Sequence, residues 1–264
     1  NFLSALCLIV CVLFLDVSLS ARLTVFKGTR VKSNSEFPFV VLLRTNSATC
    51  TGTLITQNAV LTAGHCACLP QRLEKAFTDT LRKDVTRDEV SIRKTIVHPN
   101  YHDACDAQRH GYQIANTVID HDMAIAVLDF NVDLQFKPKK VSLARLDFTN
   151  DVAPFTHIIV IGFGRDNSEN NASESTGILK YGKLDTSYCL ANLKNGGICI
   201  RHNYKGNVQM PAVGDSGGPI VRQSNMMQIG VLSGSYTIEG RNRDFSETIV
   251  SSVKANANFI KRVF

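Results

Sequence analysis

Short apolar segments separated by turn-forming residues recur along the chain, and this pattern constrains the fold more than any other feature. Many short strands at such spacing are typical of an all-β barrel or sandwich. Strands do not alternate with long helical segments, which argues against a parallel sheet. The expected strands cover residues 39–43, 53–56, 59–63, 90–98, 123–130, 157–164, 196–200, 218–221, 228–235 and 248–253.

The last residues of the chain are the one part that has a helical pattern. Between residues 251 and 264, Val253, Ile260 and either Val263 or Phe264 fall near one face of a helix. Ser251 or Ser252 is a suitable cap for its start. We therefore expect an all-β protein that ends in a helix.

The N-terminal segment differs from the rest of the chain. Residues 2–15 form an uncharged apolar run, which is short for a membrane span and fits the central region of a signal peptide. Small residues follow, with Ser18 and Ser20 placed as a cleavage signal. Residues 1–20 are therefore predicted to be a signal peptide, which predicts a secreted, extracellular protein with no membrane contact after its removal. The alternative is an N-terminal anchor helix.

Six cysteines remain after the signal peptide, and an even number in a secreted chain predicts three disulfides. A zinc site is the alternative, but the spacing of Cys66 and Cys68 does not suit a zinc knuckle. No metal site is expected. The six are Cys50, Cys66, Cys68, Cys105, Cys189 and Cys199.

The net charge of +6 is mild, so nucleic acid is not an expected partner. The most basic cluster, KPKK at 137–140, is interpreted as a solvated loop, with a weak polyanion-binding patch as the alternative. Asn171 begins the sequence NAS within a polar stretch, which predicts a glycosylated surface loop.

One stretch, PAVGDSGGPI at 211–220, places an acid beside a serine among glycines. Gly214, Gly217 and Gly218 leave Ser216 almost without neighbouring side chains. Glycine is used where the backbone takes strained dihedrals or approaches a ligand closely. Taken alone, the stretch is equally consistent with a tight turn between strands.

Two further fragments carry reactive side chains. In LTAGHC, His65 ends an apolar strand, and in HDMAIAVLDF, Asp122 opens a buried strand. A carboxylate at the start of an apolar strand is costly to bury unless it is paired, and His65 is a suitable partner. Each fragment alone is weak evidence, because such residues are more often structural.

Together, TAGHC, HDMAIAVL and GDSGGP, in this order, resemble the chymotrypsin-like (trypsin-like) serine protease family. The order distinguishes that family from subtilisin-like and α/β-hydrolase enzymes. The resemblance implies two six-stranded antiparallel β-barrels and a C-terminal helix, with a cleft between the barrels. It implies one protease domain at 21–264, with the first barrel at about 25–145 and the second barrel with the helix at about 146–264.

The resemblance also implies how each motif acts. His65, Asp122 and Ser216 form a catalytic triad, and the backbone amides of Gly214 and Ser216 form the oxyanion hole. Asp215 accepts the new N-terminus after activation of a zymogen. The implied protein is a monomeric secreted endopeptidase without a cofactor, whose partners are polypeptide substrates and protein protease inhibitors.

The family pattern also implies disulfide pairing. Cys50 and Cys66 match the bridge beside the catalytic histidine, and Cys189 and Cys199 match a bridge in the second barrel. Cys68 and Cys105 are then left to pair with each other, which links the insertion between His65 and Asp122 to the first barrel.

The sequence departs from the family pattern around the pocket for the substrate side chain that precedes the cleaved bond. Met210 occupies the pocket floor, where trypsin-like members have an aspartate, and the usual cysteine is Ala212. The pocket wall reads SGS, from Ser233 to Ser235, in place of the usual SWG. These changes predict cleavage after medium or large apolar residues rather than Arg or Lys. Glu239 or Asp244, in a loop that the sequence does not place, is the alternative source of a charge.

The activation site departs from the family as well. The mature chain begins either at VFKG, residues 25–28, or at Leu23 after cleavage at Arg22. The unusual pocket and activation site leave a second hypothesis open: a non-catalytic or weakly active protease homologue that acts as a binding or regulatory protein.

Overall fold

The structure is a computed structural model of the chain, and it describes residues 28–45, 48–68, 72–85, 88–109, 121–135, 141–164, 177–190, 193, 197–203, 211, 214–238 and 245–264. Several predictions lie outside the described residues. These are the signal peptide, both candidate mature N-termini, the basic cluster at 137–140, Asn171, Met210, Ala212, Glu239 and Asp244.

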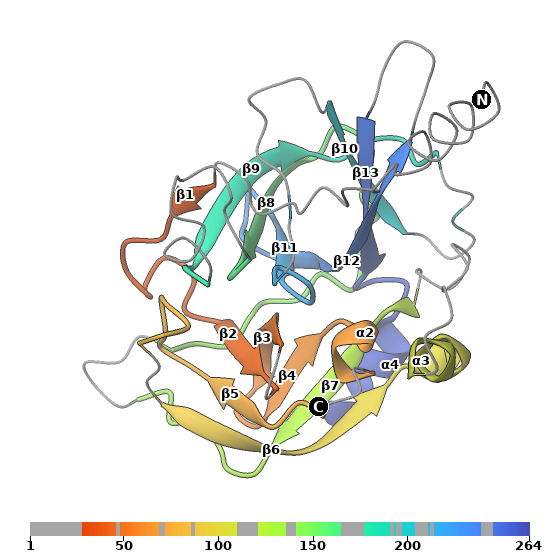
Figure 1. Cartoon of the computed structure of the whole chain (residues 1–264). Helices are drawn as coiled ribbons and strands as arrows, with labels where there is room; N and C mark the ends of the chain where they lie inside the picture. Colours follow the sequence, from red (N-terminus) through yellow and green to blue (C-terminus); the bar gives the residue numbers. More distant parts are fainter. Residues whose placement is uncertain are drawn as a thin grey trace, which may run out of the picture.

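The first half of the chain forms a closed antiparallel barrel, seen in the lower part of Figure 1. Its strand order is β2-β3-β4-β7-β6-β5. The strands are β2 Val40–Arg44, β3 Thr49–Thr56, β4 Ala59–Thr62, β5 Lys75–Phe77, β6 Glu89–Val97 and β7 Ala124–Leu128. The expected six-stranded barrel is therefore present in this half.

The second half forms a seven-stranded antiparallel sheet with the order β1-β9-β8-β11-β12-β13-β10 (Figure 1). Its strands are β1 Thr29–Arg30, β8 His157–Gly162, β9 Lys180–Asp185, β10 Ile198–Asn203, β11 Pro219–Arg222, β12 Gln228–Ile238 and β13 Phe245–Ser252. The chymotrypsin-like fold is confirmed, but within the described residues this half is a half-barrel rather than a closed six-stranded barrel.

This half does not close into a barrel because the described segment after β9 forms little backbone pairing with β10. The segment after β9 meets β10 through one isolated bridge, Ser187 to Cys199, and not through a ladder. At the other edge, β1 from the N-terminal part of the chain pairs with β9 and becomes a seventh strand.

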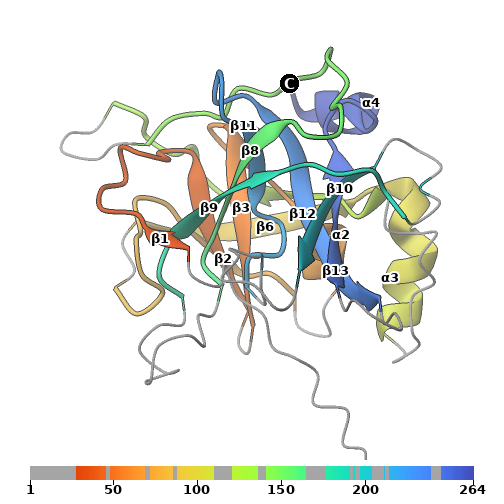
Figure 2. The same ribbon diagram turned by 90° about the horizontal axis from the view of Figure 1, so that it is seen from above.

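The helices of the described residues are short. They are α2 Gly64–Ala67, the 3-10 helix η1 Pro99–Tyr101, α3 His102–Arg109, α4 Ala257–Ile260 and the 3-10 helix η3 Lys261–Val263. Figure 2 shows α3 and α4 at the edge of the molecule. No helix in the described part of the chain is long and apolar enough to cross a membrane.

The C-terminal helix is confirmed, but its expected start at 251 was wrong. Ser251 and Ser252 belong to β13, because they pair with Val231 and Gly230 of β12. The helix begins at Ala257, and neither serine hydroxyl caps it. Phe259 and Ile260 pack into the core of the first barrel. The C-terminal residues therefore cover the first half, although they follow the second half in sequence.

The two halves meet through β3 and the turn before β11. The backbone N–H of Thr51 donates to the carbonyl of Ser216 at 2.8 Å. The Thr51 hydroxyl donates to the carbonyl of Gly214 at 2.8 Å and accepts from the N–H of Phe163 at 3.1 Å. One threonine of the first barrel therefore fixes the position of the serine turn of the second half.

Candidate active site

His65 and Asp122 form a hydrogen-bonded pair at one end of the first barrel. α2 follows β4 directly and carries His65, while Asp122 lies just before β7, which pairs with β4. The ring Nδ1 of His65 donates to Asp122 Oδ2 at 2.7 Å, and the backbone N–H of His65 donates to Oδ1 at 2.7 Å. The carboxylate therefore holds both the imidazole and the backbone that carries it.

The environment tunes the charge of both groups. Burial opposes the charged imidazolium, but the Asp122 charge and hydrogen bond outweigh burial and raise the pKa of His65. Burial likewise opposes the carboxylate, yet the charge of His65 and the hydrogen bonds from His65 and Ser233 hold the pKa of Asp122 below its usual range. A histidine with a raised pKa is a stronger base, and Asp122 remains ionised to stabilise its imidazolium.

Two further hydroxyl groups contact Asp122. Ser233 donates to Oδ2 at 2.5 Å, so this serine supports the aspartate, although its sequence position suggested the pocket wall. The Tyr101 hydroxyl also forms a hydrogen bond to Asp122, and burial, together with that charge, raises the pKa of Tyr101. The sequence analysis did not identify Tyr101, because no local pattern signals that η1 folds back onto the aspartate.

The turn that carries Ser216 depends on glycine. Gly214 and Gly217 have φ angles of +100° and +81°, which side chains rarely tolerate. A Cβ on Gly217 would lie 2.1 Å from Thr62 Oγ1 and 2.3 Å from the Thr51 carbonyl. Ser216 is partly exposed between buried neighbours, so the turn presents the hydroxyl-bearing residue while its flanks pack against the first barrel.

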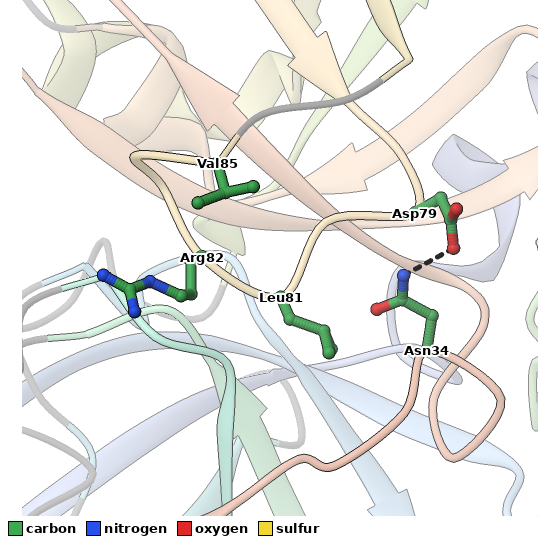
Figure 3. Close-up of a pocket in the computed structure, with 5 residues that line it drawn as sticks. All are labelled: Asn34, Asp79, Leu81, Arg82 and Val85. Atoms are coloured by element: carbon green, nitrogen blue, oxygen red, sulfur yellow. Dashed lines mark hydrogen bonds between the residues drawn. The ribbon is translucent and has the colours of Figure 1, made fainter.

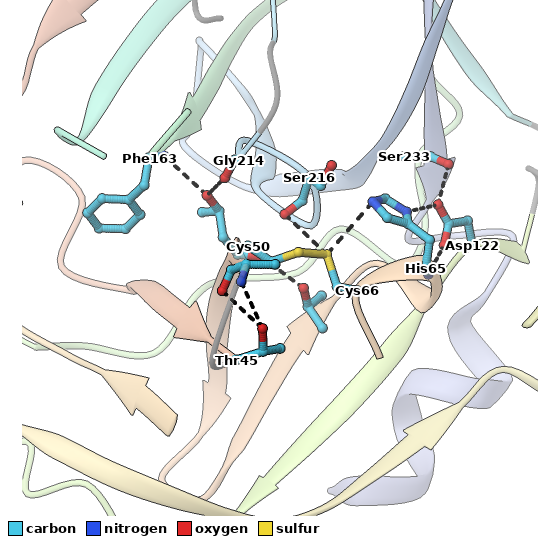
Figure 4. The surroundings of a disulfide bond; sticks show 12 residues. Thr45, Cys50, His65, Cys66, Asp122, Phe163, Gly214, Ser216 and Ser233 are labelled. Atoms are coloured by element: carbon cyan, nitrogen blue, oxygen red, sulfur yellow. Dashed lines mark hydrogen bonds and ion pairs between the residues drawn. A yellow bond between two sulfur atoms is a disulfide. The ribbon is translucent and has the colours of Figure 1, made fainter. Parts of the chain in front are cut away.

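The Cys50–Cys66 disulfide connects the two sides of the site. Its Cys66 Sγ lies 3.8 Å from Nε2 of His65 and 3.7 Å from the backbone oxygen of Ser216. A disulfide sulfur carries no proton, so both are packing contacts. Figure 4 shows His65 and Ser216 on the same side of this disulfide, with Ser233 and Asp122 behind the imidazole.

The backbone amides of Gly214 and Ser216 are available as donors. Within the described residues, neither N–H donates to a protein acceptor. The turn is fixed instead through its carbonyls and through the Gly217 and Gly218 amides, which donate to Leu232 and Asp215. This arrangement is compatible with the predicted oxyanion hole.

Asp215 lies completely buried behind the serine turn. Its Oδ1 accepts the backbone N–H of Gly164 at 2.7 Å. The predicted partner of Asp215, the N-terminus of the activated chain, lies outside the described residues.

All three expected disulfide pairings are present. Besides Cys50–Cys66, the structure contains Cys68–Cys105 and Cys189–Cys199. The first of these joins the segment after α2 to α3, and the second holds the loop after β9 against β10. Even the short separation of 10 residues between Cys189 and Cys199 therefore corresponds to a disulfide.

Ser235 lies in β12, two residues beyond Ser233, and its side chain is exposed. Its hydroxyl forms a hydrogen bond of 2.7 Å with Thr248 of β13. The sequence analysis missed Thr248, because the contact depends on the register between β12 and β13. Of the predicted pocket residues, the structure therefore describes Ser233 and Ser235, and the Met210 floor lies outside it.

A separate pocket of about 270 Å³ lies beside the loop between β5 and β6 (Figure 3). Its lining residues are Asn34, Asp79, Leu81, Arg82 and Val85. It contains none of the residues that the motifs predicted, and Arg82 is paired with Asp84 at its rim. We assign it no part in catalysis.

The known proteins that this chain resembles agree with the fold and with the geometry of the site. The family model described as Trypsin matches residues 26–260. The chain belongs to the trypsin family of serine proteases. It is 34% identical over 217 residues to the cercarial protease of Schistosoma mansoni, covering 80% of each chain. It is 27% identical to granzyme M of Rattus norvegicus, over 86% of this chain and 84% of that protein. It is 25% identical to chymotrypsin-like elastase family member 1 of Homo sapiens, over 81% of this chain and 78% of that protein.

Proposed function

We propose that this member of the trypsin family is an active secreted endopeptidase that cleaves peptide bonds through an acyl-enzyme on Ser216. The observation that carries the proposal is the His65–Asp122 pair, hydrogen bonded at 2.7 Å and placed beside the serine turn. A serine hydroxyl is a weak nucleophile at neutral pH and needs an adjacent base. His65, with its raised pKa, is that base.

The reaction proceeds by the triad mechanism of this family. Ser216 Oγ bonds to the substrate carbonyl carbon as its proton passes to Nε2 of His65. The carbonyl π electrons move to oxygen, and the Gly214 and Ser216 amides stabilise that oxyanion. When the carbonyl re-forms, the C–N bond breaks and the amine leaves with the proton from His65.

Hydrolysis of the ester repeats these steps with water. His65 takes a proton from water, the hydroxide adds to the acyl carbon, and Ser216 leaves with the proton returned by His65. Asp122 stays ionised throughout, and the hydrogen bond from Ser233 helps to keep it so.

We propose that substrates are cleaved after uncharged residues of medium or large size. Met210 offers no charge to Lys or Arg, and burial of an unpaired cation costs several kcal/mol. The hydrogen bond between Ser235 and Thr248 brings two side chains together on the predicted wall, which favours a narrowed pocket. One relative is named as a chymotrypsin-like elastase, which agrees with a non-tryptic enzyme.

Further properties follow from the sequence motifs and belong to the same proposal. They are secretion through a signal peptide at 1–20, synthesis as a zymogen, glycosylation at Asn171, and a monomeric enzyme that protein protease inhibitors recognise. Asp215, buried behind the serine turn, is the proposed partner of the new N-terminus.

A fluorophosphonate probe tests the proposed activity directly, because it phosphonylates an activated serine. The processed protein should be labelled at Ser216 and should cleave peptides, whereas Ser216→Ala should lose labelling and several orders of magnitude of peptidase activity. Ser187→Ala is the matched control, because Ser187 lies on the loop after β9 and not in the serine turn. A parent protein that is neither labelled nor active would instead support a binding or regulatory homologue.

A further inference from the structure

We propose that His202 sets the direction of a row of hydroxyl groups, so that Ser235 presents a hydrogen-bond donor to the substrate side chain in the specificity pocket. The inference rests on the proposed peptidase activity and deepens it. His202 would be a positioning residue, because it acts on substrate through Thr248 and Ser235.

The row crosses three adjacent strands of the second sheet. Ser235 Oγ of β12 lies 2.7 Å from Thr248 Oγ1 of β13, which lies 3.4 Å from Nε2 of His202 in β10. Thr248 pairs with Ser235 in register and is diagonal to His202, which faces Ser246. These side chains therefore project from the same face of the sheet.

The outer end of the row lies close to the triad. Ser235 is two residues from Ser233, which donates to Asp122. Two residues of a strand span about 7 Å. Ser235 is exposed, whereas Thr248 and His202 are 1% and 2% exposed, so the row leads from the substrate side into the interior.

The orphan nitrogen of His202 gives the row its direction. Its Nδ1 is buried and has no hydrogen-bond partner among the described residues. A buried N–H without an acceptor is rarer and more costly than an unused lone pair, so Nδ1 should be the unprotonated nitrogen. Burial lowers the pKa of His202 to about 4, so the ring is neutral at neutral pH and carries its single proton on Nε2.

The proton on Nε2 determines the direction of each hydrogen bond in the row. Nε2–H donates to Thr248, whose hydroxyl hydrogen is then directed to Ser235 Oγ. Ser235 Oγ accepts the hydrogen bond from Thr248. Its own hydroxyl hydrogen therefore remains available for an acceptor on the substrate. The charged neighbours Arg201 and Glu247 lie 3.6 Å from each other and, by strand alternation, project from the opposite face.

The substrate class follows from this direction. An outward O–H donor favours a side chain that carries an uncharged oxygen acceptor at the depth of Ser235, such as the amide carbonyl of Gln. Lys and Arg carry donors alone and gain nothing from it. Among uncharged substrates of similar size, the enzyme should therefore prefer Gln to Met before the cleaved bond, which departs from the apolar preference that Met210 and the pocket wall predict from sequence.

The test compares two peptides that differ only by Gln or Met at this position. For the parent, kcat/KM should favour Gln by about tenfold, the typical contribution of one hydrogen bond. Ser235→Ala, Thr248→Val and His202→Leu should each bring the ratio close to one. His202→Gln, whose amide N–H replaces the Nε2 donor, should restore the preference.

Two comparisons separate the proposal from a structural effect. The effects of Ser235→Ala and His202→Leu on the ratio should not add, since both act on one row. The rate of fluorophosphonate labelling reports on the triad and should stay unchanged in His202→Leu and His202→Gln. A labelled, active parent that does not prefer Gln would overturn the inference alone, and an unlabelled parent would overturn both the activity and the inference.

Discussion

Two buried strands, β7 of the first barrel and β13 of the second sheet, differ in chemistry. All five residues of β7, AIAVL, are buried and apolar. In β13 the buried residues include Ser246, Glu247, Thr248 and Ser251. Burial of a polar side chain stabilises less than burial of an apolar one, because its hydrogen bonds in the protein largely replace those it made with water. We therefore expect β13 to contribute less to stability than β7.

In the described residues, a His–Asp pair of the first barrel and one of the second half lie in opposite environments. His65–Asp122 is mostly enclosed, with side-chain exposures of 24% and 4%, whereas His157–Asp185 is 76% and 55% exposed. Exposed pairs contribute little, because water screens the charges. Contact geometry alone therefore does not identify the functional pair.

The largest expected effect comes from neutralising one aspartate of each pair. Asp122→Asn should lower kcat by about 10⁴-fold, because the amide no longer selects the productive tautomer of His65. Asp185→Asn should change kcat less than twofold, since its pair is exposed to water. Steady-state kinetics on one peptide substrate compares the two, and similar losses would contradict the distinction between them.

A smaller effect separates the apolar core from the polar one. Leu54→Ala in β3, a fully buried position, should lower the free energy of unfolding by about 2–5 kcal/mol. Thr248→Val in β13 keeps the side-chain shape and removes one hydroxyl, so the cost should be about 0.5–1.5 kcal/mol. Denaturant unfolding in a Ser216→Ala background, which prevents self-digestion, measures both.

The order of these two losses is the informative result. A greater loss for Thr248→Val would mean that the polar row stabilises the second half more than the apolar core stabilises the first. The contrast drawn between β7 and β13 would then be wrong.

The remaining effect is a pH dependence of stability, which is spread over more than two pH units. Burial lowers the pKa of His202 to about 4, and burial with the nearby His121, Arg262 and His102 lowers the pKa of His98 to about 4. The unfolded chain then binds more protons between about pH 4 and the ordinary histidine pKa near 6.5. Stability should fall as the pH falls through this window, by up to about 1.4 kcal/mol per pH unit for each group.

The pKa of His65 shifts in the opposite direction, so His65 provides an internal comparison. Its pKa is raised, so its contribution is present below the unfolded pKa and is lost as the pH rises through the folded value. His202→Phe should flatten the acid slope in the Ser216→Ala background, and His98→Phe should flatten it less, because His98 is only half-buried. Unchanged slopes in both variants would place the acid sensitivity elsewhere.

Ten strands were predicted from apolar runs, and all ten are present. The three strands that were missed lack this signal: β1 is two residues long, β5 is three residues long, and β9, KYGKLD, mixes charged and apolar residues. These strands form because neighbouring strands supply hydrogen-bonding edges, which a local pattern does not contain. The helix α3 was missed too, since its sequence, HDACDAQR, is mostly polar and is held by the Cys68–Cys105 bridge.

The sequence by itself determined the chemistry of the candidate site. The motifs around His65, Asp122 and Ser216 each fit a local backbone requirement, such as the positive φ angles of Gly214 and Gly217, and local requirements are visible in a sequence. The tertiary structure alone decided which other residues serve them. Tyr101 meets Asp122 through chain folding. Thr248 and His202 line up with Ser235 through strand register, where a shift of one residue would turn each side chain to the opposite face.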